Sequence, residues 1–503
     1  ANYGLFRRCY SAISSSELRE TRRLRYPTSV PGPVSNEALL LQGHPGLGHP
    51  SPAPFLVSQT AIVASSDGCP HPRKQHTSLL ISRTVAFSSR AVSAQRHREH
   101  PNSSRLRGHL TCDRLVRMSP LTPPNAAQTT AQFRCGLIAD IQYADVDDVG
   151  NLSGTQWRRY RGALDTARRA VDFFNAQHAE SPLAFLLHNG DIIDHKNAFD
   201  LDADAPLPES VSLAALAAVL RVLDGASCRP WLFTIGNHEM YNFTRAQLRL
   251  GVRCEGIELP FCCAGGGGQL FHSFSPHPAW RAVVLDSYDV SIYGEGRGQG
   301  LDAGALAQLG KHNPNVAEYV AAHPEVLRTE RMSGGFPYFK GLEGAAQRWV
   351  PFNGGIGAKQ LQWLRQELRE AAAAGQRVVV LTHLIVHPGA SSGRTLLWNY
   401  EEVLGVLEAA GGGTVAAVVS GHQHEGGAFS DPATGLHHLA LRSPLLAEPG
   451  LPGPYAVLEA RPGSLTLSGH GDFLGSGESG GDGDLRRLHF PLRPSARAPG
   501  QDY

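Results

Sequence analysis

From residue 133 onward, short apolar runs alternate with longer stretches of helical periodicity, and this alternation limits the possible folds most strongly. Each apolar run is short and bounded by turn residues, which is typical of a strand. Strand and helix in alternating units predict an α/β fold with helices outside a central pair of sheets. The expected strands are residues 133–139, 183–187, 231–235, 281–286, 377–381, 414–420, 437–441, 455–459 and 464–467, and the expected helices are 156–179, 208–223, 359–374 and 400–410.

Two segments interrupt the alternation. Residues 251–268 are a loop-like stretch with many Gly and two adjacent Cys, and residues 287–353 are long and poorly periodic. Long connections inside a domain are usually functional loops or additions specific to one family. The sequence assigns a role to neither segment.

The two ends of the chain differ in composition from the part between them. Residues 1–130 are rich in Arg, Ser and Pro, with 16 Lys and Arg against 6 Asp and Glu, and we expect them to be disordered. Such an acid-poor segment fits an organelle transit peptide; the alternative is that translation starts at Met118 and residues 1–117 are spurious. We expect one folded domain at 131–470 and a loosely ordered Gly/Pro/Arg-containing tail at 471–503. The expected location is cytoplasmic, or organellar if residues 1–117 are a targeting segment.

Charge and hydropathy exclude several classes of protein. Mean hydropathy is −0.21, and we find no apolar stretch near the roughly 18 residues that a membrane-spanning helix needs. Residues 131–503 carry 30 Lys and Arg against 39 Asp and Glu. An acidic body of this kind gives no reason to expect nucleic-acid binding. We therefore expect no membrane span and no nucleic-acid partner, and we favour a monomer.

Polar residues of the kinds that bind metals follow the expected strands. In open α/β sheets, active sites gather at the carboxyl ends of strands. Any one Asp or Asn at such a place would more often cap a helix or make a turn, but five clusters in succession favour a common site. Asp140 and Gln142 follow the first strand, Asp191 the second, Asn237 and His238 the third, His383 a later strand, and His422 and His424 another.

The residue types in these clusters favour a site for two metal ions. Carboxylate and amide oxygens together with three imidazoles suit intermediate divalent ions such as Mn²⁺, Fe²⁺ or Zn²⁺. One carboxylate can bridge two ions about 3.5–4 Å apart, the spacing used in two-metal hydrolysis. The residue types therefore predict a dinuclear centre for Mn²⁺, Fe²⁺ or Zn²⁺.

Five blocks of this sequence resemble the signature of the calcineurin-like metallophosphoesterases: Asp140-x-Gln142, Gly190-Asp191-x-x-Asp194, Gly236-Asn237-His238-Glu239, His383, and Gly421-His422-x-His424. The resemblance implies a four-layer sandwich of two central mixed β-sheets flanked by helices, with 131–470 as the catalytic domain. It also implies one ion held by Asp140, Gln142, Asp191 and His424, and a second held by Asp191, Asn237, His383 and His422. Asp191 would bridge the two ions.

Finer motifs resemble the manganese-dependent ADP-ribose/CDP-alcohol diphosphatases. These are Gln142 in place of the more usual His, and the segments Asp140–Asp145, Gly190–Asp194, Gly236–Phe243, His312–Asn315, Phe352–Gly355 and Trp398–Tyr400. The resemblance implies Mn²⁺ as the favoured metal and hydrolysis of a small nucleotide substrate: ADP-ribose to AMP and ribose 5-phosphate, or CDP-choline to CMP and phosphocholine. Two departures are Glu425 in place of an expected Asp and the enlarged stretch 251–268, which leaves the substrate rim unassigned.

Roles for the remaining residues are expectations with alternatives. His238 is expected to donate a proton or a hydrogen bond to the leaving oxygen; the alternative is that it only orients Asn237. Asp194 is expected to orient a ligating His. The substrate-binding residues are unknown, although several aromatic side chains could stack on a nucleobase or simply pack in the core. These are Tyr143, Tyr241, Phe243, Trp398 and Tyr400.

Two other functions compete with the diphosphatase hypothesis. A phosphomonoesterase or cyclic-nucleotide phosphodiesterase could use the same metals. A third possibility is an inactive scaffold, but scaffolds of that kind lose ligands and all seven expected ligand positions are filled here.

Overall fold

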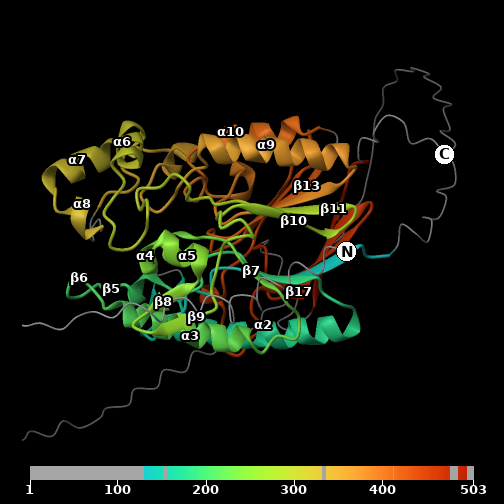
Figure 1. Cartoon of the computed structure of the whole chain (residues 1–503), viewed down its shortest axis with the longest axis horizontal. Coiled ribbons are helices and arrows are strands. Elements are labelled where there is room, and N and C mark those ends of the chain that lie inside the picture. The colour runs from blue at the N-terminus through green and yellow to red at the C-terminus, as the bar shows by residue number, and fades with distance from the viewer. Residues whose placement is uncertain (1–129, 151–155, 331–335, 412, 476–484, 495–503) are drawn as a thin grey trace, which may run out of the picture. The chain divides into compact units, whose positions relative to one another are not determined.

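The structure is a computed structural model that describes residues 130–150, 156–330, 336–411, 413–475 and 485–494. These residues all belong to the compact unit Leu121–Tyr503. Within it, two six-stranded sheets lie face to face, and helices cover the outer face of each (Figure 1). The predicted four-layer sandwich of two mixed sheets between helices is confirmed. The prediction of disorder for residues 1–129 lies outside the described residues.

The first sheet has the order β18-β17-β16-β1-β4-β7. Strands β1, β4 and β7 are parallel, and β16 to β18 extend the sheet by antiparallel pairing. The sheet is therefore mixed, with the carboxyl ends of its three parallel strands at one edge. The strands are β1 (Phe133–Ile138), β4 (Phe185–His188), β7 (Trp231–Phe233), β16 (Tyr455–Arg461), β17 (Ser464–His470) and β18 (Arg486–Pro491).

The second sheet has the order β10-β11-β12-β13-β15-β14. Its four inner strands are parallel, and the two edge strands are antiparallel to their neighbours. Every residue of β12 and β13 is buried, as expected for parallel strands that are covered on both faces. The strands are β10 (His272–His277), β11 (Trp280–Val284), β12 (Arg377–Leu381), β13 (Val415–Ser420), β14 (Gly427–Ser430) and β15 (His437–Ala440).

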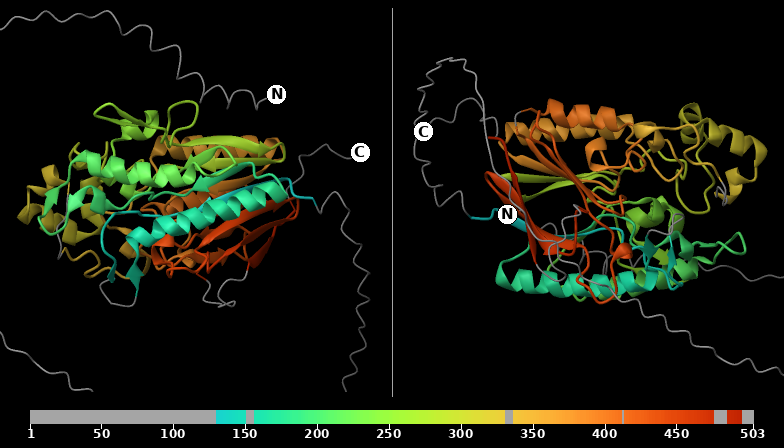
Figure 2. Two further views of the ribbon diagram at one scale, coloured as in Figure 1. Left: turned by 90° about the horizontal axis from the view of Figure 1, so that it is seen from below. Right: turned by 180° about the vertical axis from the view of Figure 1, so that it is seen from behind.

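Four amphipathic helices form the outer layers, as the further views also show (Figure 2). Helices α2 (Tyr160–Glu180) and α3 (Glu209–Leu223) cover the first sheet, and α9 (Ala358–Ala373) and α10 (Tyr400–Ala409) cover the second (Figure 1). In α9 the buried side chains recur at three- and four-residue spacing, which places one apolar face on the sheet. The periodicity in the sequence predicted all four helices.

The two interruptions of the alternation carry structure that the sequence analysis did not predict. Residues 251–268 include a two-stranded sheet of β8 (Val252–Cys254) and β9 (Ile257–Leu259). The longer segment contains α6 (Ala303–His312), α7 (Pro314–Ala322) and α8 (Val326–Thr329), which lie together at one end of the sandwich (Figure 1). Asn313 caps α7 and donates to the carbonyls of Tyr338 and Trp349, so the 312–315 motif fixes the path of this segment.

Short elements complete the fold. Helix α4 (Asn237–Asn242) follows β7, and α5 (Arg245–Leu250) begins with a capping box from Thr244 and Gln247. The others are β2 (Val149–Gly150), β3 (Trp157–Arg158), β5 (Phe199–Asp200) and β6 (Ala205–Pro206).

One expectation about the tail was wrong. Residues 486–491 were expected to be loosely ordered, but they form β18, which pairs along β17 from Ser464 to Gly469. The side chains of β18 alternate between half-buried and exposed positions, so the strand has an inner and an outer face. No helix within the described part of the chain is long and apolar enough to cross a membrane.

Candidate metal centre

The carboxyl ends of parallel strands from both sheets bring the expected ligands together. Asp191 lies just beyond β4, and His383 and His422 lie just beyond β12 and β13. Three groups of side chains have ligand atoms within 4.8 Å of one another, and two of them consist of expected ligands: Asp191 with His383 and His422, and Asp140 with Asp191 and His424. The third group is Asp194 with His195 and His238. The two groups of expected ligands share Asp191.

Four of the expected ligands have a backbone conformation that is rare for residues with a side chain. The φ angles of Asp140, Gln142, Asp191 and His422 are +52°, +45°, +59° and +65°. Non-glycine residues with positive φ often cluster at functional sites, because the surrounding structure must offset the strain. Here the four residues lie in the turns that follow β1, β4 and β13.

Asp191 lies at the middle of the cluster. Its Oδ1 accepts the backbone N–H of His238 at 2.9 Å, which fixes the carboxylate. Its Oδ2 lies 3.3 Å from Nε2 of His383 and 3.0 Å from Nε2 of Gln142. A Cβ atom on Gly236 would come within 2.0 Å of Oδ1, so this arrangement requires glycine there. One oxygen of Asp191 is thus held by the backbone while the other faces both sets of ligands.

Hydrogen bonds orient the imidazoles. Nδ1 of His383 lies 2.8 Å from the carbonyl oxygen of Asn189, and Nε2 of His422 lies 2.9 Å from Oδ1 of Asn353. Each of these nitrogens therefore donates, which leaves Nε2 of His383 and Nδ1 of His422 facing each other at 3.2 Å. Either a proton or a metal ion between these two ring nitrogens satisfies both, and metal-ligating imidazoles typically have such an outer hydrogen bond.

Gln142 gives a second indication that a cation fits. Its buried Oε1 has no hydrogen-bond partner among the described residues, whereas its Nε2 lies 2.8 Å from Nε2 of His424. Rotation of the amide by half a turn would exchange the two atoms and turn the oxygen toward Asp191 and His424. Nε2 of His424 also lies 3.9 Å from Oδ1 of Asp140. The donor set around this half therefore suits a divalent ion.

The electrostatics of the centre favour cations. Burial raises the pKa of Asp140 well above its usual value. Burial would also raise the pKa of Asp191, but contact with His383 outweighs it and holds the pKa of that carboxyl well below its usual range. Burial lowers the pKa of His424 to about 3 and that of His422 well below normal. Burial would also lower the pKa of His383, but contact with Asp191 outweighs it and raises the pKa to about 10. His422 and His424 are therefore ready to bind a metal, whereas His383 and Asp140 lose a proton when a cation binds.

Asn237 lies at the edge of this cluster. Its Oδ1 accepts a hydrogen bond from the hydroxyl of Tyr288 at 3.2 Å, and its Nδ2 donates to the hydroxyl of Tyr241 at 3.3 Å. The adjacent backbone N–H of His238 bonds to Asp191. The structure therefore places Asn237 next to the second set, with its amide held by two tyrosines.

His238 is positioned as a hydrogen-bond donor. Its Nδ1 accepts the backbone N–H of His195 at 2.8 Å, so the proton of the neutral ring resides on Nε2, which lies 3.9 Å from Oδ2 of Asp191. Burial lowers the pKa of His238. The expectation that Asp194 orients a ligating His is wrong: its carboxylate lies 3.0 Å from Nδ1 of His195 and 3.5 Å from Nδ1 of His238. Asp194 thus pairs with His195, and its Oδ2, which faces Nδ1 of His238, has no hydrogen-bond partner among the described residues.

Sequence reasoning missed two residues that hold the loops in place. The buried carboxylate of Glu239 accepts the backbone N–H groups of Asp191, Ile192 and Gly236 at 2.7–2.8 Å, and burial raises its pKa to about 7. Asn353 links His422 to the carbonyl of Arg394. Both residues lie in quoted motifs, so the motifs were the only sequence signal for them.

The aromatic residues considered for base stacking divide into two groups. Trp398 and Phe243 are fully buried in the hydrophobic core, so the alternative of core packing is confirmed for both. Tyr143, Tyr241 and Tyr400 are half-buried, and the ring of Tyr241 packs between His238 and Tyr293.

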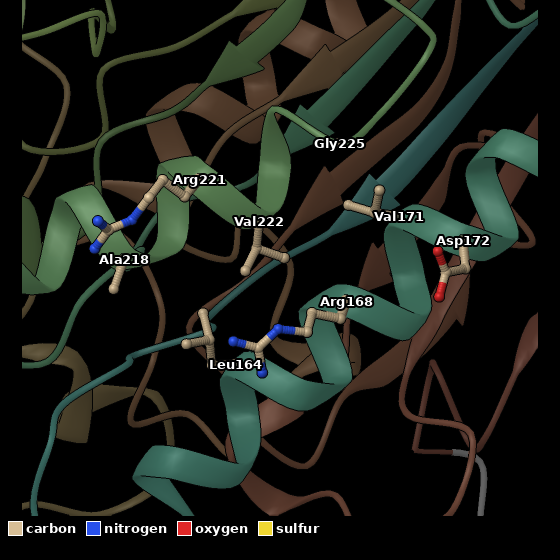
Figure 3. Close-up of a pocket in the computed structure, with 8 residues that line it drawn as sticks. All are labelled: Leu164, Arg168, Val171, Asp172, Ala218, Arg221, Val222 and Gly225. Atoms are coloured by element: carbon tan, nitrogen blue, oxygen red, sulfur yellow. The ribbon is translucent and has the colours of Figure 1, made fainter.

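A surface pocket of about 530 Å³ lies apart from this centre, between α2 and α3 (Figure 3). Leu164, Val171 and Val222 give it an apolar floor, with Arg168 and Arg221 beside them. None of the expected ligands lines it. Asp172 is the one carboxylate that lines it and no imidazole does, so we do not assign the reaction to it.

Comparison with known proteins agrees with this geometry. A model of the family described as calcineurin-like phosphoesterase matches residues 133–426, which include all seven expected ligands, and the chain belongs to this family. Curated relatives include the manganese-dependent ADP-ribose/CDP-alcohol diphosphatases of Arabidopsis thaliana (35% identical; 63% of this chain and 88% of that protein) and Homo sapiens (30%; 67% and 90%). A dimetal phosphatase structure from Danio rerio matches with a TM-score of 0.56 and 30% identity, over 72% of this chain and 99% of that one. The resemblance found in the motifs is confirmed.

Proposed function

We propose that this protein hydrolyses the diphosphate of nucleoside diphosphates linked to a sugar or an alcohol. The observation that carries the proposal is the pair of buried ligand sets that share Asp191, with the neutral His238 beside them. Such a pair suits in-line displacement at phosphorus. The relatives named as ADP-ribose/CDP-alcohol diphosphatases support ADP-ribose and CDP-choline as substrates.

Two divalent cations would be held by the seven expected ligands. Asp140, Gln142 and His424 would hold one ion, Asn237, His383 and His422 the other, and Asp191 would hold both. When bound, the ions supply an activated water and neutralise charge on the phosphoryl oxygens. The relatives are named manganese-dependent, which supports Mn²⁺, while the mixed oxygen and nitrogen donors also suit Fe²⁺ or Zn²⁺.

The chain's own groups position the substrate and the proton. His238 donates its Nε2–H to the oxygen of the leaving phosphate, since its Nδ1 is occupied by the His195 N–H. Water adds across the P–O–P bond, so ADP-ribose gives AMP and ribose 5-phosphate, and CDP-choline gives CMP and phosphocholine. Glu239 holds the loops that carry Asp191 and Gly236 together, because its Oε2 accepts a backbone N–H from each.

A substrate panel tests the proposal. Purified protein is assayed with ADP-ribose, CDP-choline, cyclic AMP and p-nitrophenyl phosphate, in Mn²⁺ and Mg²⁺ separately. We expect the two diphosphates to be cleaved with the highest kcat/KM in Mn²⁺. Preference for p-nitrophenyl phosphate or cyclic AMP would instead support a phosphomonoesterase or a cyclic-nucleotide phosphodiesterase of the same family.

We also propose that the protein acts as a monomer in the cytoplasm. The five described cysteines are all free thiols, which is typical of a reducing compartment. Cell fractionation and size-exclusion chromatography with light scattering test the two statements.

A further inference from the structure

An aromatic cluster adjoins the metal centre on the side of His422. The ring of Phe352 lies 6.0 Å from the imidazole of His422, and the ring of Phe339 lies 6.3 Å from that of Phe352. Both phenylalanines are half-buried. We propose that Phe352, Phe339 and Arg394 form the surface on which the nucleobase of the substrate stacks, an inference that rests on the proposed function.

Hydrogen bonds fix Phe352 at the edge of the metal centre. Its carbonyl accepts from the hydroxyl of Tyr288 at 3.1 Å, and the same hydroxyl contacts Oδ1 of Asn237. The next residue, Asn353, accepts from Nε2 of His422 at 2.9 Å. Phe352 is therefore held beside two expected ligands, and in this proposal a nucleotide whose phosphates lie at the metals places its base on this ring.

Arg394 extends the surface outward. Its guanidinium lies over the ring of Phe339, with Cζ 4.6 Å from the ring centroid, and the residue is exposed. Its Nε donates to Oε1 of Gln347, a neutral group, and it has no ion pair with any described residue. The nearby Arg348 differs, because it pairs with Glu401.

This surface suits a nucleobase better than a sugar or an alcohol. Aromatic rings and guanidinium planes stack on the π-face of any base without reading its hydrogen-bonding edge. Adenine and cytosine would therefore both bind, and the other half of the substrate would need no contact here. The surface thus explains how one site accepts ADP-linked and CDP-linked compounds.

Comparing the nucleotide products, which carry a base, with ribose 5-phosphate, which does not, separates recognition of the base from recognition of the phosphate. The Mn²⁺-loaded full chain is titrated by calorimetry with AMP, CMP and ribose 5-phosphate. For Phe339→Leu we expect Kd to rise roughly tenfold for AMP and CMP and to stay unchanged for ribose 5-phosphate. Arg394→Gln, a change on the surface, should act in the same direction, and Phe339→Tyr should keep the wild-type values.

The matched control is Phe271→Leu, since the half-buried ring of Phe271 packs on Trp363 instead, and it should leave all three Kd values unchanged. The inference is overturned if Phe339→Leu and Arg394→Gln leave AMP binding unchanged, or if they weaken ribose 5-phosphate binding equally. If the wild type cleaves neither ADP-ribose nor CDP-choline, the proposed function fails, but the comparison of AMP with ribose 5-phosphate still tests the stacking surface.

Discussion

Replacing Glu239 with Gln should destabilise the protein far more than an isosteric change usually does. In the wild type, Oε2 accepts the N–H groups of Asp191 and Gly236, and Oε1 accepts that of Ile192. A Gln side chain can place its oxygen on only one side, so at least one N–H group faces an NH₂ group instead. Above about pH 8 the Glu239 carboxyl is charged, because its pKa is about 7, and losing one hydrogen bond to a buried charged acceptor costs about 1.5–3 kcal/mol. We expect the free energy of unfolding to fall by roughly 2 kcal/mol.

Urea unfolding in the presence of EDTA measures this cost without a contribution from bound metal. Glu239→Ala should cost more, because it leaves all three N–H groups without an acceptor. Glu448→Gln is the control, since Glu448 pairs with Arg159 and its side chain is 61% exposed, and exposed pairs contribute about 0–1 kcal/mol. A loss for Glu239→Gln no larger than that of Glu448→Gln would refute the reasoning.

Three further predictions concern the centre and the core. His238→Ala should keep both metals in an elemental analysis and lower kcat by about 10²–10⁴-fold; unchanged turnover would remove its proposed role. Gly236→Ala should weaken Mn²⁺ binding, because its Cβ would displace Asp191; a wild-type Mn²⁺ titration would contradict this. Burial lowers the pKa of His438 to about 3, so the unfolded chain binds the proton first and stability falls as pH drops below about 6.5. At pH 5.5 the loss is about 1.4 kcal/mol, and His438→Phe should remove that part of the pH dependence in EDTA; an unchanged dependence would argue against it.

The sequence predicted that the candidate ligands follow the strands of the sheets, because parallel strands place their carboxyl ends at a common edge. Asp191 and His422 could be identified without coordinates, since the turn after each strand needs few residues and leaves little freedom. The edge strands β10, β14 and β18 could not be predicted from the sequence, because they are half-exposed and their apolar pattern is weak.

Contacts between distant parts of the chain were harder to predict. Glu239 accepts hydrogen bonds from backbone groups 47 and 48 residues earlier in the chain. Asn353 bonds to groups 41 and 69 residues later. Nothing in the segments around Glu239 and Asn353 reveals these partners. The sequence left two roles open for Trp398, base stacking and core packing, because the burial of a side chain depends on tertiary structure. The structure places Trp398 in the core.

Diffraction data collected at the manganese absorption edge from crystals of the Mn²⁺-loaded protein test the central claim most directly. We predict two anomalous peaks about 3.5–4 Å apart, with Oδ2 of Asp191 between them. One peak should lie beside His424 and the other beside His383 and His422. A single peak, or two peaks that do not share Asp191, would contradict the account.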